Sequence, residues 1–348
     1  MFFRYAELTM LPHHSRAVGI IVLATLWIAN GFADEPGCEV STLVSTGGPL
    51  PRDPHTLAIR WTGYSNFELV YNGKVILLDA YFDRGSTYPP LGLRASDIRK
   101  ADVILIGHAH FDHMSDAASV AMTTGAPVIG APITTDKLRS QGLAPSLIKT
   151  VNGKGGELFK FSGFEIEPIL GRHGQPPPNV TTAFNQALKS VIAPFTPEQT
   201  AELAKIRDRG SSDPRIIAEG TISYLITFDD GFRVMYRDSG GVVTDYEKAV
   251  MKRIERVDVA LAAVAADVLP SLTVKQALEY LRTYRPAVYI PAHHDADFNG
   301  LWRPTEPIFQ ALKDEAPSLI TVSKQYREPV CLDTNNSIQR HAKVRLVQ

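Results

Sequence analysis

Short apolar runs, separated by turn residues, recur along most of the chain and predict a β-rich fold. The runs Val103–Ile106 and Ala287–Ala292 are typical of buried strands, and residues 57–61 alternate apolar and polar side chains as a half-buried strand does. Asn72-Gly73 stands between two apolar runs and predicts a two-residue hairpin turn. Further strands are expected at residues 67–71, 75–78, 127–130, 159–161, 164–170, 221–228, 232–236 and 257–264.

Helical segments follow several of these strands, and the combination predicts an α/β fold. Asp116, Thr196 and Thr273 are suited to the N-cap positions of three helices. Residues 175–218 interrupt the strand pattern as a helical insertion, which is interpreted as a lid, an oligomer contact or a simple surface excursion. Helices are expected at residues 116–122, 134–141, 182–192, 197–209 and 274–284.

The first 33 residues have the pattern of an export signal. Arg16 precedes an apolar run from Ala17 to Ala29, and small residues follow it at Gly31 and Ala33. The run is short of the roughly 20 apolar residues that a membrane span needs. The sequence therefore predicts an exported protein, periplasmic or extracellular, that touches a membrane only if this segment stays uncleaved. Residues 34–56 are expected to form a loose leader and residues 326–348 a C-terminal tail.

The charge and cysteine content narrow the possible functions. The formal net charge is -1 and no run of Lys or Arg occurs, which argues against a nucleic-acid surface. The two cysteines, Cys38 and Cys331, lie near the two ends of the expected mature chain. In an oxidising compartment this pair predicts a disulfide, with two unpaired thiols as the alternative.

Three histidines and an aspartate follow the buried strand 103–106 at once. They are His108, His110, Asp112 and His113, and they fall where open α/β sheets keep ligand sites, at the carboxyl end of a strand. Imidazole nitrogens with a carboxylate suit zinc, and also manganese or iron. A histidine-rich surface turn without a metal is the alternative, but this spacing after a buried strand favours a metal site.

The segment His108-Ala109-His110-Phe111-Asp112-His113 resembles the HxHxDH signature of the metallo-β-lactamase superfamily. The rest of that pattern follows in order over residues 57–325, the expected hydrolase domain. The resemblance implies a four-layer αββα sandwich, here with the helical insertion 175–218. It is greatest to the lactonase- and phospholipase-D-like branch of the superfamily.

The resemblance also implies a ligand set for two metal ions. It assigns His108, His110 and His173 to one ion. Asp112, His113 and His293 would bind the other ion, and Asp238 would lie between the two. Asp79 would support these ligands from behind. His294 remains an alternative to His293, because a shift of one residue exchanges them.

Two divalent ions, expected to be Zn²⁺ with Mn²⁺ or Fe as alternatives, would hold a hydroxide and polarise the bond that it attacks. The implied reaction is hydrolysis of an ester, lactone, amide or phosphodiester in a small-molecule or lipid-like substrate, with Asp112 and Asp238 as catalytic residues. Alternatives are an iron-dependent oxidoreductase on the same scaffold and a non-catalytic metal-binding protein. The aromatic segment 80–97 is either a wall of the substrate site or a hydrophobic loop packed on its own fold.

Overall fold

The chain divides into two units, Met1–Ala33 and Asp34–Gln348, and the described residues all lie in the second. The computed structural model describes residue 38 and residues 40–347, except 176–177, 179–180, 183–185, 187–188, 191–193, 265–269, 296–303 and 338–342. The predicted export signal and most of the predicted helix 182–192 therefore lie outside the described residues. Within the described part of the chain, no helix combines the length and apolar character that a membrane span requires.

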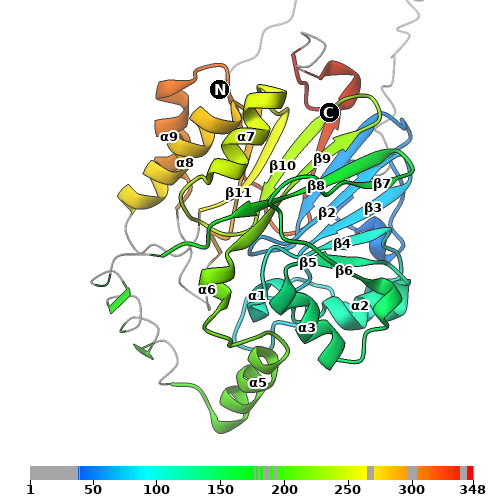
Figure 1. Ribbon diagram of the computed structural model, residues 1–348, viewed down its shortest axis with the longest axis vertical. Helices are drawn as coiled ribbons and strands as arrows, with labels where there is room; N and C mark the ends of the chain where they lie inside the picture. Colours follow the sequence, from blue (N-terminus) through cyan, green and yellow to red (C-terminus); the bar gives the residue numbers. More distant parts are fainter. Residues whose placement is uncertain are drawn as a thin grey trace, which may run out of the picture. The chain divides into compact units, whose positions relative to one another are not determined.

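Seven strands form the first sheet, in the order β14-β1-β2-β3-β4-β5-β6 (Figure 1). The predicted hairpin is confirmed: Asn72 and Gly73 join β2 to β3 with φ angles of 44° and 72°, as a two-residue turn of this kind requires. β3 and β4 run parallel, so their carboxyl ends lie side by side. The strands are β1 (Thr56–Trp61), β2 (Phe67–Tyr71), β3 (Lys74–Leu78), β4 (Val103–Leu105), β5 (Val128–Gly130), β6 (Ile148–Thr150) and β14 (Pro329–Asp333).

The second sheet also has seven strands, in the order β13-β12-β11-β10-β9-β8-β7. β9 is antiparallel to both of its neighbours, and β10 to β12 are parallel. The carboxyl ends of β8, β10 and β12 consequently lie along one edge of this sheet. The strands are β7 (Phe159–Phe161), β8 (Phe164–Gly171), β9 (Thr221–Phe228), β10 (Arg233–Arg237), β11 (Val259–Ala263), β12 (Val288–Ala292) and β13 (Ile320–Thr321).

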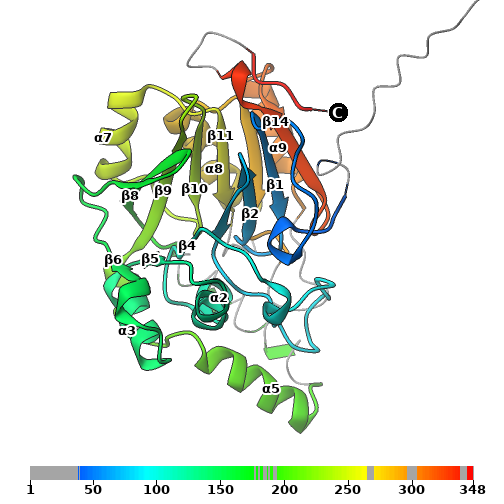
Figure 2. The ribbon, with the colours of Figure 1, turned by 90° about the vertical axis from the view of Figure 1, so that its right-hand side faces the viewer.

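Helices cover the outer face of each sheet, which confirms the predicted four-layer arrangement (Figures 1 and 2). The first sheet carries α2 (Ala117–Thr124) and α3 (Pro132–Ser140), and the second carries α7 (Asp245–Ile254), α8 (Pro270–Tyr284) and α9 (Glu306–Glu315). The other helices are α1 (Phe111–Met114), α5 (Pro197–Asp208) and α6 (Ile216–Glu219), and 3-10 turns occur at Val44–Thr46, Ala95–Asp97, Pro145–Leu147 and Thr334–Asn336.

Three hydrophobic clusters correspond to the three interfaces between these layers. In β1, Leu57 and Ile59 point into the core between the sheets, whereas Ala58 points towards α2 and α3. In β10, Tyr236 points between the sheets and Met235 towards α7 and α8. Both faces of the central strands are covered, so most of their side chains are buried. Burial of each large apolar side chain stabilises the fold by about 1.5–3 kcal/mol.

The predictions of a loose leader and a C-terminal tail were wrong. β14 completes the first sheet by pairing with β1, and the predicted disulfide Cys38–Cys331 is confirmed. In the segment before β1, the N–H groups of Val44 and Ser45 donate hydrogen bonds to the carboxylate of Glu68, at 3.0 and 2.7 Å. The segment before β1 thus buries polar side chains of β1 and β2. In the half-buried strand that the sequence predicted, such side chains would face water.

Two of the predicted helix caps also differ from the structure. Asp116 precedes α2, but its carboxylate accepts hydrogen bonds from the N–H groups of Phe82 and Asp83 instead of capping the helix. α8 begins at Pro270, so Thr273 lies within it. The third cap is confirmed, because Thr196 accepts a hydrogen bond from the N–H of Gln199 at the start of α5.

The part of the insertion that is described packs on the aromatic segment 80–97. Tyr81 and Tyr88 are buried in one cluster with Tyr64 and with Leu203 and Ile206 of α5. Of the two interpretations of the aromatic segment, a substrate wall or a loop packed on its own fold, the structure supports the second for these two tyrosines.

Candidate metal centre

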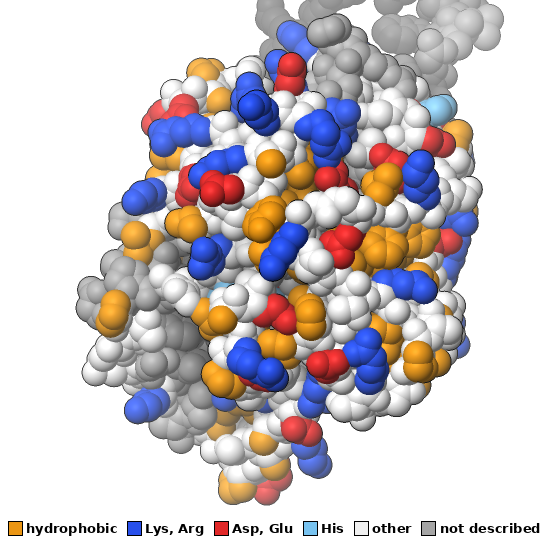
Figure 3. Space-filling model, in the orientation of Figure 1, with side chains coloured by type: hydrophobic (Ala, Val, Ile, Leu, Met, Phe, Trp, Pro, Cys, Tyr) orange, Lys and Arg blue, Asp and Glu red, His pale blue; other side chains and the backbone are white. Residues whose placement is uncertain are grey.

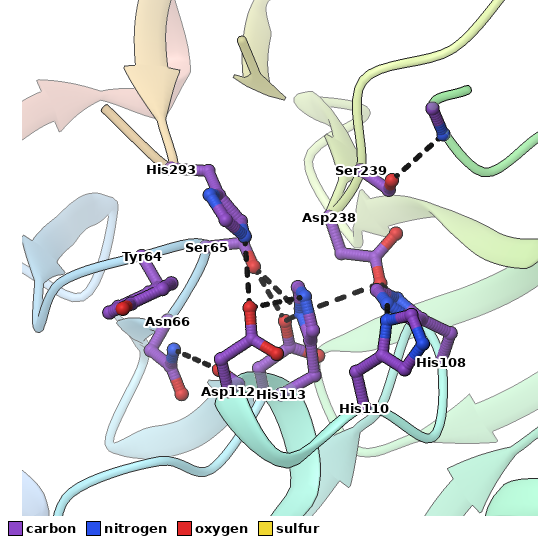
Figure 4. Close-up of polar contacts among 12 residues, drawn as sticks. Tyr64, Ser65, Asn66, His108, His110, Asp112, His113, Asp238, Ser239 and His293 are labelled. Carbon is purple, nitrogen blue, oxygen red and sulfur yellow. Dashed lines mark hydrogen bonds and ion pairs between the residues drawn. The ribbon is translucent and has the colours of Figure 1, made fainter. Parts of the chain in front are cut away.

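The seven predicted ligands come together where the carboxyl ends of strands from both sheets face each other. Figure 4 labels all of them except His173. The first sheet supplies the turn between β4 and α1, with His110 at the N-cap position of α1. The second sheet supplies His173, Asp238 and His293, each within two residues of the end of β8, β10 or β12. The parallel strand directions place all of these side chains on one side of the fold.

His108, His110 and His173 form the first triplet. Nε2 of His108 lies 2.8 Å from Nδ1 of His110, and the ring of His173 stands 4.7 Å and 5.0 Å from those two rings. One nitrogen of each ring lies within 4.8 Å of the others, which is close enough for one ion to bind all three.

Asp112, His113 and His293 form the second triplet. Oδ2 of Asp112 lies 3.1 Å from Nε2 of His293 and 3.3 Å from Nε2 of His113. His294 instead stacks on Trp61, with ring centroids 4.4 Å apart. Of the two candidate histidines, the structure therefore brings His293 to the cluster.

Asp238 lies between the triplets, but one of its oxygens already has a partner. Its Oδ2 is 2.5 Å from Nδ1 of His108 and 3.6 Å from Nδ1 of His113. Its Oδ1 is buried and has no hydrogen-bond partner among the described residues. This close approach requires a glycine at position 107, where a Cβ atom would fall 1.9 Å from Oδ2. Oδ2 is thus the oxygen of Asp238 that faces His108 and His113.

The histidines are oriented by hydrogen bonds on their far side. Nδ1 of His113 lies 2.6 Å from Oδ2 of Asp79, and Nδ1 of His173 lies 2.7 Å from the carbonyl oxygen of Gly174. With the His108–Asp238 contact, three rings thus have Nδ1 engaged by an acceptor. Such contacts leave the lone pair on Nε2, the form that binds a metal.

Asp79 is itself held by residues that the sequence did not single out. It accepts hydrogen bonds from the hydroxyl groups of Ser65 and Tyr236, at 2.8 and 2.7 Å, and from the N–H of Gly107 at 3.0 Å. Ser65 and Tyr236 have no distinguishing sequence pattern, since one lies in a turn and the other in an apolar strand. Asp79 occupies the supporting position that the resemblance implied.

The pKa values of His108 and His173 shift in the opposite direction to that of His113. Burial, followed by the neighbouring histidines, lowers the pKa of His108, and burial lowers the pKa of His173 to about 4. Burial also opposes a charge on His113, but the carboxylates of Asp112 and Asp79 outweigh it and raise its pKa well above the ordinary value. At pH 7 without metal, the first triplet is therefore neutral and His113 carries a proton.

This difference predicts proton release on metal binding. Zn²⁺ in both triplets is expected to release about one proton per chain at pH 7, because His113 must lose its proton whereas the first triplet is already neutral. Calorimetric titration in two buffers of different ionisation enthalpy measures this number. As the pH falls towards about 4, His173 also takes up a proton, so the affinity of the first triplet should decrease. Binding without proton release at pH 7 would contradict the assignment.

The residues fit a pair of divalent cations. Neutral imidazoles and carboxylates are the donors that zinc prefers and that manganese and iron also accept. The buried Oδ1 of Asp238 points to the same conclusion, because a buried carboxylate oxygen without a partner is costly. The fold and this ligand cluster define the chain as a metallo-β-lactamase-fold hydrolase.

Comparison with known proteins agrees with this class. The beta-lactamase superfamily domain matches residues 74–294, and the chain belongs to this family. A UPF0173 metal-dependent hydrolase of Cupriavidus necator is 25% identical over 228 residues, covering 65% of this chain and 70% of the relative. Another from Polynucleobacter asymbioticus is 21% identical over 299 residues, covering 85% and 90%.

Among solved structures, the fold is similar to Igni18, a metallo hydrolase from Ignicoccus hospitalis. The TM-score is 0.55 with 18% sequence identity, over 79% of this chain and 98% of that one. The predicted resemblance to the metallo-β-lactamase superfamily is thereby confirmed at the level of family and fold.

Proposed function

We propose that the chain is an exported hydrolase with a dinuclear metal centre, most often loaded with Zn²⁺, that cleaves an ester, lactone, amide or phosphodiester bond. The observation that carries this proposal is the pair of adjacent triplets, with Asp238 between them. One ion would be held by His108, His110 and His173, and the other by Asp112, His113 and His293. Bound together, two such ions supply Lewis acidity and lower the pKa of water enough for hydrolysis at neutral pH.

The carboxylates have distinct parts in this proposal. Although burial opposes its charge, His113 and the contact with His293 lower the pKa of Asp112 well below its usual range. Asp112 therefore stays ionised and available as a metal ligand. Asp238 orients His108 through Oδ2, which also lies 3.6 Å from Nδ1 of His113. These properties support Asp112 and Asp238 as the catalytic residues.

Two further observations support the proposed location and substrate. A disulfide between Cys38 and Cys331 is stable in the oxidising compartments that exported proteins reach. On the face shown in Figure 3, Lys and Arg side chains are interspersed with Asp and Glu, which favours a small-molecule or lipid-like substrate over a nucleic acid.

The proposed function is tested by elemental analysis of the protein purified from the exported fraction, followed by a substrate screen. Two equivalents of zinc are expected, together with hydrolysis of a lactone, ester, amide or phosphodiester that chelation removes and Zn²⁺ restores. β-Lactams serve as a comparison substrate in the same screen. Iron as the native metal, with oxygen consumption and no hydrolysis, would support an oxidoreductase instead. Absence of bound metal would overturn the proposal.

A further inference from the structure

Two arginines are buried directly behind the metal centre, and neither belongs to the ligand set. Arg237 is the last residue of β10 and is fully buried, and Arg84 in the aromatic segment is 4% exposed. A buried guanidinium is costly unless its donors are satisfied. The acceptors that these two groups use therefore show what each arginine holds in place.

All five N–H donors of Arg237 have acceptors. Nη1 donates to the carboxylate of Glu247 at 2.7 Å, in a fully buried ion pair. The other acceptors are the hydroxyl oxygen of Tyr284 and the carbonyl oxygens of Arg172, Ser239 and Val242, at 3.4, 3.0, 3.0 and 3.2 Å.

Two of these carbonyl groups are next to predicted ligands. Arg172 precedes His173 after β8, and Ser239 follows Asp238 after β10. The guanidinium thereby connects the two strand ends that carry His173 and Asp238. Gly241 allows this approach, because a Cβ atom there would lie 2.2 Å from the carbonyl oxygen of Arg172.

Arg84 has an equivalent place behind the second triplet. Its Nη1 pairs with Asp295 at 3.1 Å, two residues beyond His293, and its Nη2 donates to the carbonyl of Thr62 at 2.6 Å. The guanidinium carbon also lies 5.0 Å from the ring of Tyr64, within cation–π range. Gly63 is required beside it, since a Cβ atom there would fall 2.0 Å from Nη2.

Tyr64 transmits this contact to His293. Its N–H donates to the carboxylate of Asp295 at 2.8 Å, and its carbonyl oxygen accepts the N–H of His293 at 2.6 Å. His293 has a φ of 60°, a left-handed conformation that costs about 1–3 kcal/mol outside glycine. Such a backbone persists only when its surroundings hold it, and here Arg84, Asp295 and Tyr64 do so.

We infer that each half of the metal centre has its own positioning residue: Arg237 fixes His173 of the first triplet, together with Asp238 between the triplets, and Arg84 fixes His293 of the second. Neither arginine touches the proposed ions, so each acts through the ligands. The inference rests on the proposed dinuclear function. It implies that the two halves can be weakened separately.

The experiment is a calorimetric Zn²⁺ titration of the metal-depleted full-length chain and of three variants, Arg237→Lys, Arg84→Lys and Arg60→Lys. Lysine keeps the charge but has three donors instead of five and lacks the planar fork. Arg60→Lys is the matched control, because Arg60 is equally buried and paired with Glu68, and both Glu68 and Val40, to which it donates hydrogen bonds, lie outside the ligand loops. The ligand variants His110→Ala and His293→Ala identify which binding step belongs to which triplet.

Arg237→Lys is expected to weaken zinc binding at the first triplet by about 10–100-fold, the usual effect of losing a group that supports metal ligands. Arg84→Lys should do the same at the second triplet, and Arg60→Lys should leave both affinities unchanged while lowering thermal stability. Equal weakening of both triplets by either arginine variant, or no weakening beyond that of Arg60→Lys, would overturn the inference. Fewer than two zinc ions in the unmodified chain would overturn the dinuclear function as well.

Discussion

Replacement of His110 by alanine is expected to lower kcat/KM for the hydrolysed substrate by about 10³-fold or more. Metal-ion catalysis supplies several kcal/mol of transition-state stabilisation, and each 1.36 kcal/mol corresponds to a factor of ten in rate. Nδ1 of His110 lies 2.8 Å from Nε2 of His108, so the variant removes one donor from the first triplet. His110 is only partly buried, and the fold should therefore remain intact.

The measurement combines the rate with zinc content and circular dichroism. Asp238→Ala is expected to give the same loss, because Asp238 orients His108 and lies between the two triplets. His294→Ala is the matched control: it removes a buried histidine that stacks on Trp61, and it should cost stability but leave two zinc ions bound. Undiminished hydrolysis by His110→Ala, or loss of metal in His294→Ala alone, would contradict the assignment.

Opening the disulfide is expected to lower the free energy of unfolding by as much as about 5 kcal/mol. Cys38 and Cys331 are 293 positions apart, and the entropy lost by the unfolded chain when a loop closes increases with loop length. The bond joins the segment before the 3-10 turn Val44–Thr46 to β14. After reduction, the hydrogen bonds from the N–H groups of Val44 and Ser45 to Glu68 should also break more easily.

Urea unfolding of metal-depleted protein, with and without a reductant, measures this contribution. The double variant Cys38→Ala/Cys331→Ala should match the reduced protein and show no response to reductant. Equal unfolding midpoints for oxidised and reduced protein would show that the disulfide does not stabilise the fold.

Local patterns predicted the strands and the histidine turn after β4, because their information lies close together in the chain, whereas His173, Asp238 and His293 were implied only by the family resemblance. Asn72-Gly73 fixed one hairpin, and the histidines after β4 indicated the site. The partners of β14 were not predictable in this way, since its pairing with β1 spans nearly the whole described chain. Cys331 within β14 was a signal for this pairing once a disulfide with Cys38 was expected.

Other features depended on backbone geometry that a sequence does not display. The choice between His293 and His294 follows from the left-handed conformation at His293, which turns this ring towards Asp112. The contact between Asp238 and His108 depends on the space left by Gly107. Asp116 has the composition of a helix cap, but tertiary contacts with Phe82, and with Arg209 at 3.2 Å, engage its carboxylate instead.

The position of β14 also has a consequence for the order of events during synthesis. β1 is among the first strands to leave the ribosome, and its outer edge stays open until the last strand emerges. An open strand edge is a template for pairing with another chain. The nascent chain is therefore open to pairing with other chains at β1 until β14 has emerged and covers this edge.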